Sequence, residues 1–168
     1  MSKHPTPAAV EPAAREDHVS RARLIELLNE DLAREYQAII AYVTYSQVIK
    51  GAEYMSIAQE LEVHAGEELQ HAIIIAKQID YLGGAPTVVA DTVRTSEKAD
   101  AMLRFDLQNE TNTIRAYRDR VRQCEGLGEF AMAEHLRAIL MDEQEHQIDL
   151  ATALGIDVPN MSRNVPGK

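Results

Sequence analysis

The chain has 168 residues, of which 45% are hydrophobic and only 5% aromatic, and it carries a formal net charge of −10. This length fits one domain with flanking tails, and a core of aliphatic side chains favours helices over strands. The acidic balance argues against a nucleic-acid surface, and no apolar run approaches the roughly 18 residues of a membrane helix. The single cysteine, Cys124, excludes an internal disulfide and a thiolate metal cage, and it favours a reducing, cytoplasmic setting.

The two ends of the chain differ in composition from its middle. The first residues are rich in proline and alanine and contain no apolar stretch of the kind that a signal peptide needs. We therefore expect a disordered N-terminal tail over residues 1–18, a helical domain over residues 19–157, and an irregular C-terminal tail over residues 158–168.

Apolar residues at three- and four-residue spacing predict four long helices. The first begins after Ser20, a candidate N-cap, and the predicted ranges are 20–51, 53–82, 96–126 and 128–155. Short glycine turns make the first two helices antiparallel neighbours, and likewise the last two.

The link over residues 83–95 is long enough to run the length of such a bundle. Extended, it spans roughly 43 Å, and a helix of about 28 residues is roughly 42 Å long. The sequence therefore predicts an all-α four-helix bundle with one long crossover between the second and third helices.

Each predicted helix carries a carboxylate in the middle of its apolar, core-facing row. Two of the helices also contain a Glu-x-x-His motif, formed by Glu68 with His71 and by Glu143 with His146. The central glutamates of the other two helices are Glu35 and Glu110. Charged groups at these core positions need an explanation.

These polar positions repeat at one fixed offset. Glu110, Tyr117, Glu143 and His146 each lie 75 positions after a residue of the same type, namely Glu35, Tyr42, Glu68 and His71. A lone Glu-x-x-His match is a weak signal, but a shared offset across four helices is a strong one. The chain reads as two helical hairpins of one design, which would bring four carboxylates and two imidazoles together at the bundle centre.

Carboxylates and imidazoles at this spacing can bind metal. Residues i and i+3 of a helix lie on one face with Cβ atoms roughly 5–6 Å apart, so each motif can hold one ion while other carboxylates bridge to a second. Four glutamates balance the charge of two divalent cations, and without metal they would repel one another in a poorly solvated core. Oxygen and imidazole donors suit iron or manganese. The alternative is a buried polar network without metal, but no lysine or arginine is expected on these rows near the glutamates to neutralise them.

The set Glu35, Glu68-x-x-His71, Glu110 and Glu143-x-x-His146 resembles the dinuclear iron site of bacterioferritins, in the ferritin-like superfamily, over about residues 20–157. The resemblance implies a ferritin-like bundle that acts as a ferroxidase and stores iron. It would bind two Fe²⁺, oxidise them with O₂ or H₂O₂, and pass Fe³⁺ to a mineral core in a homo-oligomeric shell, with no nucleic-acid or membrane partner. It also implies that Glu68 and Glu143 bridge the two irons.

The resemblance gives each remaining ligand a place. Glu35 with His71, and Glu110 with His146, would be the terminal ligands of one iron each. Tyr42 matches a tyrosine beside the family's iron site, and we expect it either to donate one electron or to hydrogen-bond a ligand glutamate.

Haem is not expected, because Leu69 stands where bacterioferritins place the ligating methionine. His64 is expected to be a core histidine, or one that supports a ligand, rather than a seventh ligand. Cys124 is expected to be buried, and His4, His18 and His135 to be solvated.

Two other functions remain open at this point. The first keeps the di-iron site but drops storage, as a peroxide-scavenging oxidoreductase that works as a dimer. The second is a metal-stabilised structural bundle without turnover. Iron retained per chain, together with the size of the assembly, would separate these from a storage shell.

Overall fold

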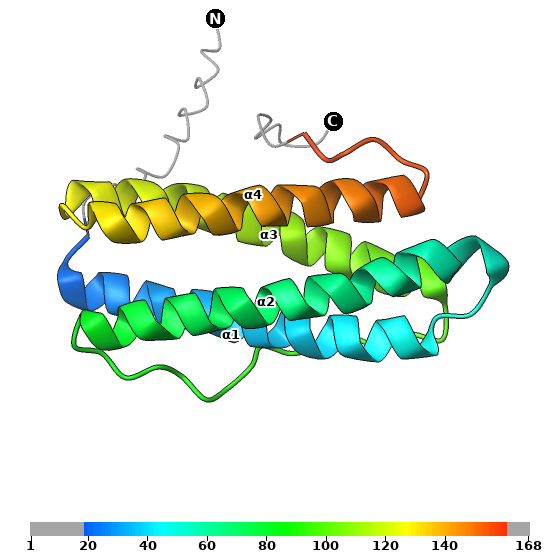
Figure 1. Ribbon diagram of the computed structural model, residues 1–168, viewed down its shortest axis with the longest axis horizontal. Coiled ribbons are helices and arrows are strands. Elements are labelled where there is room, and N and C mark those ends of the chain that lie inside the picture. Colours follow the sequence, from blue (N-terminus) through cyan, green and yellow to red (C-terminus); the bar gives the residue numbers. More distant parts are fainter. Residues whose placement is uncertain (1–18, 161–168) are drawn as a thin grey trace, which may run out of the picture.

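The computed structural model describes residues 19–160. Within that range the chain forms a short 3-10 turn, η1 (Ala52–Tyr54), and four long helices: α1 (Arg21–Val48), α2 (Met55–Tyr81), α3 (Ala99–Gly126) and α4 (Phe130–Ala153). Figure 1 shows them as two roughly parallel layers, one made of α1 and α2 and the other of α3 and α4. The predicted all-α four-helix bundle is confirmed. The N-terminal tail and residues 161–168 lie outside the described residues.

The helix ends follow local hydrogen bonds more closely than the apolar pattern. Ser20 is the N-cap of α1, as predicted, because its hydroxyl accepts a hydrogen bond from the backbone N–H of Arg23 at 3.1 Å. The prediction that α1 reaches residue 51 is wrong by three residues. Ile49 already has an extended backbone, and Gly51 takes a φ of 132°, which a residue with a side chain rarely adopts.

The start of α3 also differs from the prediction. Ser96 lies before the helix, and its hydroxyl accepts a hydrogen bond from the backbone N–H of Lys98 at 3.1 Å. This local turn competes with helix formation, so α3 begins at Ala99.

The crossover runs along α1 and ends against α3. Asp91 donates its backbone N–H to the carbonyl of Ala33 at 3.0 Å. Further along, the guanidinium of Arg94 lies 4.4 Å from the ring centroid of Phe105 on α3. The link therefore covers the α1–α3 side of the bundle, and α3 starts at the same end as α2, as the link length predicts.

The core is divided along the bundle axis. One aliphatic cluster, which includes Leu28, Ile79 and Leu136, fills one end. A second, which includes Ile57, Leu103 and Leu150, fills the other. The buried carboxylates and histidines come from the middle turns of the helices, between the two clusters. Over residues 19–160, no helix has both the length and the apolar character needed to cross a membrane.

Candidate metal centre

The six predicted ligands come together in the middle of the bundle, and each is at most 2% exposed. They form two groups that share Glu68 and Glu143. One group adds Glu35 and His71, and the other adds Glu110 and His146. Within each group the candidate ligand atoms lie within 4.8 Å of one another, as needed for a common ion.

Both imidazoles turn the same ring nitrogen to the shared glutamates. Nδ1 of His71 lies 3.2 Å from Glu68 Oε2 and 3.4 Å from Glu143 Oε1. Nδ1 of His146 lies 3.1 Å from Glu68 Oε1 and 3.6 Å from Glu143 Oε2. Each shared carboxylate therefore faces both histidines, which is the arrangement that two bridging ligands require.

Several oxygen and nitrogen atoms of this cluster that could bind a metal lack a hydrogen-bond partner, which is unusual for buried polar atoms. In the part of the chain that the structure describes, one or more oxygens of every glutamate in the centre are without one. The atoms are Glu35 Oε2, Glu68 Oε1, Glu110 Oε2, both carboxylate oxygens of Glu143, and His146 Nδ1. Carboxylate oxygens that converge in this way fit a cation.

The surroundings of the two outer glutamates favour their protonated form when no metal is bound. Burial, reinforced by the charges of Glu68 and Glu143, raises the pKa of Glu35 well above its ordinary value. Burial and the charge of Glu143 likewise raise the pKa of Glu110. These carboxyls become anionic ligands only when a cation offsets the cost of burying their charge.

The two histidines carry positive charge in the metal-free protein. Burial opposes this, but hydrogen bonds to Glu143 and Glu68 prevail and raise the pKa of His146 to about 12. The same balance raises the pKa of His71. Burial also opposes ionisation of Glu68 and Glu143, yet their hydrogen bonds within the cluster lower the pKa of both carboxyls. Protons thus balance the charge that two cations would otherwise balance.

Each outer glutamate accepts a hydrogen bond from a tyrosine of the opposite hairpin. The hydroxyl of Tyr42 donates to Glu110 Oε1, and the hydroxyl of Tyr117 donates to Glu35 Oε1. Burial raises the pKa of both phenols, so both keep their protons. Each bond uses one carboxylate oxygen and leaves the other directed to the centre.

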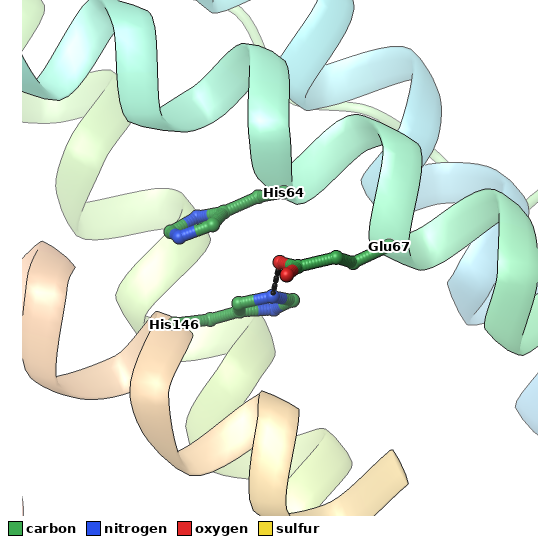
Figure 2. A group of neighbouring side chains, drawn as sticks. All are labelled: His64, Glu67 and His146. Carbon is green, nitrogen blue, oxygen red and sulfur yellow. Dashed lines mark hydrogen bonds and ion pairs between the residues drawn. The ribbon is translucent and has the colours of Figure 1, made fainter.

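Two further carboxylates support the histidines from the far side of each ring. Asp142 Oδ2 lies 3.1 Å from Nε2 of His71. Glu67 Oε2 lies 2.9 Å from Nε2 of His146, as Figure 2 shows. A carboxylate on Nε2 fixes the ring so that Nδ1 can face a metal. The sequence interpretation did not include this pair, although Glu67 and Asp142 are also 75 positions apart and the same offset could have found them.

The recorded ion pairs of the central glutamates fit the expectation that no lysine or arginine neutralises them, and the core also holds one buried arginine elsewhere. Over residues 19–160, the recorded ion pairs of Glu35, Glu68 and Glu143 involve only histidines. Arg120, however, is buried on α3 and binds Asp31. The apolar period does not predict this ion pair, because the long side chain of Arg120 reaches from α3 to another helix.

The remaining single residues follow the sequence interpretation. Cys124 and His64 are buried, and His135 is exposed. His4 and His18 lie outside the described residues.

A small cavity lies at the centre, with residues of α1 and α3 among its lining. This cavity of about 10 Å³, close to the space of one water, is lined by Glu35, Glu68, Glu110 and Glu143 among others. A larger surface depression, which shares Arg34, Gln37 and Asn109 with this cavity, lies outside it beneath the crossover. The centre is therefore buried but close to solvent on this side.

Comparison with known proteins now identifies the family. The model of the ferritin-like domain matches residues 25–157. The chain belongs to the ferritin-like family. Among curated relatives of this ferritin-like chain, a bacterioferritin of Desulfovibrio desulfuricans is 31% identical over 133 residues, which cover 79% of this chain and 73% of the relative.

Solved structures agree with this assignment. A ferritin-like di-iron carboxylate protein of Bacillus anthracis aligns with a TM-score of 0.77 and 34% identity, over 80% of this chain and 96% of the other. A dodecameric thioferritin of Bacteroides fragilis aligns with a TM-score of 0.75 and 26% identity, over 82% and 87% of the two chains. A bacterioferritin of Rhodobacter capsulatus with a metal-free dinuclear site aligns with a TM-score of 0.73 and 27% identity, over 80% and 84%.

Proposed function

We propose that this ferritin-like chain is a ferroxidase that binds two Fe²⁺ in the middle of its bundle. One observation carries the proposal: the two ligand groups share Glu68 and Glu143, so the centre suits a pair of ions rather than one. Glu35 with His71, and Glu110 with His146, are the proposed terminal ligands. Each Fe²⁺ would give one electron and become Fe³⁺, and the two electrons with two protons would reduce O₂ to H₂O₂, or H₂O₂ to two molecules of water.

Neighbouring side chains hold the proposed ligands in place, and protons of the metal-free site balance its charge. Glu67 and Asp142 orient the two histidines from behind, and Tyr42 and Tyr117 hold the outer glutamates. Tyr42 lies in a position to hydrogen-bond Glu110, and it can also serve as a one-electron donor. The protons that the metal-free centre holds leave as cations enter.

We further propose that the chain stores iron in a homo-oligomeric shell. The support is family membership, bacterioferritins among the relatives, and a related chain that assembles as a dodecamer. Haem is not part of the proposal, because Leu69 stands in the place of the methionine ligand and its side chain has no haem-ligating atom.

Aerobic Fe²⁺ loading tests both parts of the proposal. We expect rapid Fe²⁺ oxidation, followed by absorbance, and retention of many more than two irons per chain in a large assembly, measured by size-exclusion mass and iron content. Glu68→Ala should abolish the rapid phase while circular dichroism shows an unchanged helical content. The matched control is Glu62→Ala, the same substitution on the exposed face of the same helix. This variant should oxidise iron normally.

Each other result counts against a defined part of the proposal. Unchanged oxidation in Glu68→Ala would remove the assignment of the site. Two irons per chain with fast peroxide turnover in a dimer would replace storage with a non-storing oxidoreductase. A higher melting temperature with metal but no oxidation would leave a structural bundle.

A further inference from the structure

The internal repeat is broken beside one of the two histidines of the centre. His64 is 2% exposed, and its ring lies against that of His146, with the centroids 4.1 Å apart and the planes tilted by 31° (Figure 2). The position 75 residues later holds Ile139, which is 1% exposed and belongs to an aliphatic cluster. One half of the chain thus places an imidazole where the other half places a hydrocarbon.

His64 is itself held in place from the edge of the bundle. Its Nε2 lies 3.3 Å from Asp149 Oδ2 on α4 and 4.0 Å from Glu60 Oε1, one turn earlier on α2. The repeat positions of these two carboxylates are occupied by His135 and Ile74, which cannot play the same part. The break in the repeat therefore involves three residues that act together.

His146 consequently has contacts that His71 lacks. His64 covers one face of its ring, and Tyr42 meets it edge-on with the centroids 6.0 Å apart. Over residues 19–160, the ring contact recorded for His71 is with His146 alone, at 6.2 Å. Both histidines have a carboxylate on Nε2, so the difference lies in what packs on the ring.

We propose that His64 is a positioning residue that acts through His146 and makes the two metal positions unequal. The position that contains His146 binds a divalent cation more tightly than the position that contains His71. The physical reason is preorganisation: a ring that is already fixed loses less freedom when its Nδ1 binds a cation. This inference rests on the dinuclear site proposed above.

The same geometry suggests a competing role for His64. Donor atoms of Glu60, His64 and Asp149 lie within 4.8 Å of one another and could hold a third ion. Nothing besides these three side chains points to an ion there, and Nε2 of His64 already has Asp149 as a partner. The number of ions bound per chain separates the two roles.

Anaerobic Co²⁺ titration of the metal-free protein tests the inference without any turnover. Bound Co²⁺ is followed by its visible absorption spectrum and by calorimetry. His71→Ala leaves the His146 position, and His146→Ala leaves the His71 position. His64→Ile, which installs the residue that the repeat carries, is then added to each background to complete a double-mutant cycle.

We expect the His71→Ala protein to bind Co²⁺ more tightly than the His146→Ala protein. His64→Ile should weaken the first by about tenfold and leave the second unchanged. Asp149 is partly exposed and holds the His64 ring, so Asp149→Asn should also weaken Co²⁺ binding by the His71→Ala protein, but by less than His64→Ile does. His135→Ala, an exposed histidine on α4, should change neither affinity, and melting temperatures of the metal-free variants verify folding.

Three results would overturn the inference. They are equal Co²⁺ affinity in the two single-position proteins, equal weakening of both positions by His64→Ile, and a third Co²⁺ per chain that disappears with His64→Ile. Failure of the parent chain to bind a pair of Co²⁺ ions would instead count against the proposed function. The two failures are therefore distinguishable.

Discussion

Asp31 and Asp106 occupy matching positions in the two hairpins, 75 residues apart, but their surroundings are opposite. Asp31 receives two hydrogen bonds from the guanidinium of Arg120, at 2.6 and 3.1 Å, and a further one from Arg34. Asp106 is equally buried, and its Oδ2 has no hydrogen-bond partner among the described residues. One carboxylate is thus paired in the core, while the other is costly to ionise.

Arg120→Ala should destabilise the protein strongly, because it leaves the buried Asp31 with Arg34 alone. Removing one partner of a buried ion pair costs about 3–5 kcal/mol. Urea denaturation of the metal-free protein measures this loss. Arg122→Ala, which removes a surface pair with Asp119, is the control and should cost less than about 1 kcal/mol. Equal effects of the two changes would contradict this account of Asp31.

Asp106→Asn should change how stability depends on pH. Burial, reinforced by the charge of Glu68, raises the pKa of Asp106 well above its ordinary value despite the opposing charge of Arg94. A raised folded-state pKa gives stability that is present below the unfolded value of about 3.9 and is lost as the pH rises. The melting temperature of the variant, relative to that of the parent, should therefore rise as the pH increases above about 4. A constant difference over this range would refute the prediction.

At this scale the sequence predicts the proposed ligands more readily than the residues that support them. Glu35, Glu68, Glu110 and Glu143 could be found because charged residues repeat at core positions, where periodicity makes them conspicuous. Glu67 and Asp142 could not be found by that criterion, because each precedes a ligand and reads as exposed surface. Their role depends on the direction of a side chain toward the opposite hairpin, which residue spacing does not specify.

The helices themselves follow the apolar period closely, and their ends do not. All four were predicted in the right order with the right long connection, because periodicity over 24 to 28 residues is a strong signal. The C-terminal end of α1 depends instead on the backbone turn at Ile49 to Gly51, and the start of α3 depends on the hydroxyl of Ser96. These are single interactions with no periodic pattern behind them.

The crossover depends on a small number of polar contacts with α1. The side-chain amide of Asn29 donates to the carbonyl of Ala85 at 3.2 Å and accepts from the backbone N–H of Thr87 at 2.6 Å. Asn29→Ala should lower the free energy of unfolding by about 1–3 kcal/mol, since backbone groups of the link lose their partner. Hydrogen exchange should also become faster at Thr87.

The control for this prediction is Gln108→Ala, which removes an amide whose recorded bond is to Asn112 on the exposed face of α3. We expect no change in exchange along the crossover in that variant. Unaltered exchange at Thr87 in Asn29→Ala would show that the link is held elsewhere.

For the whole molecule, metal loading should be coupled to proton release. The pKa values of Glu35, Glu110, His71 and His146 are all raised in the metal-free protein, which favours the protonated form of each group. Binding two cations should therefore release up to four protons per chain, and apparent affinity should fall as the pH is lowered. Titration with Zn²⁺ in weakly buffered solution, followed by a pH indicator, measures this number.

A matched variant sharpens the measurement. Glu35→Gln removes one titrating carboxyl from the centre and should release about one proton fewer. Cation binding without proton release would contradict the charge state inferred for the metal-free centre.

The sharing of Glu68 and Glu143 has a mechanical consequence. Each of the two proposed ion positions takes ligands from both layers of the bundle, so neither layer could bind an ion with a full set of ligands alone. In the proposed site, each bound ion would therefore join the α1–α2 layer to the α3–α4 layer, in addition to the hydrogen bonds that Tyr42, Tyr117 and Arg120 already make between them. Metal loading should therefore hold the two layers together more firmly than they are held in the metal-free protein.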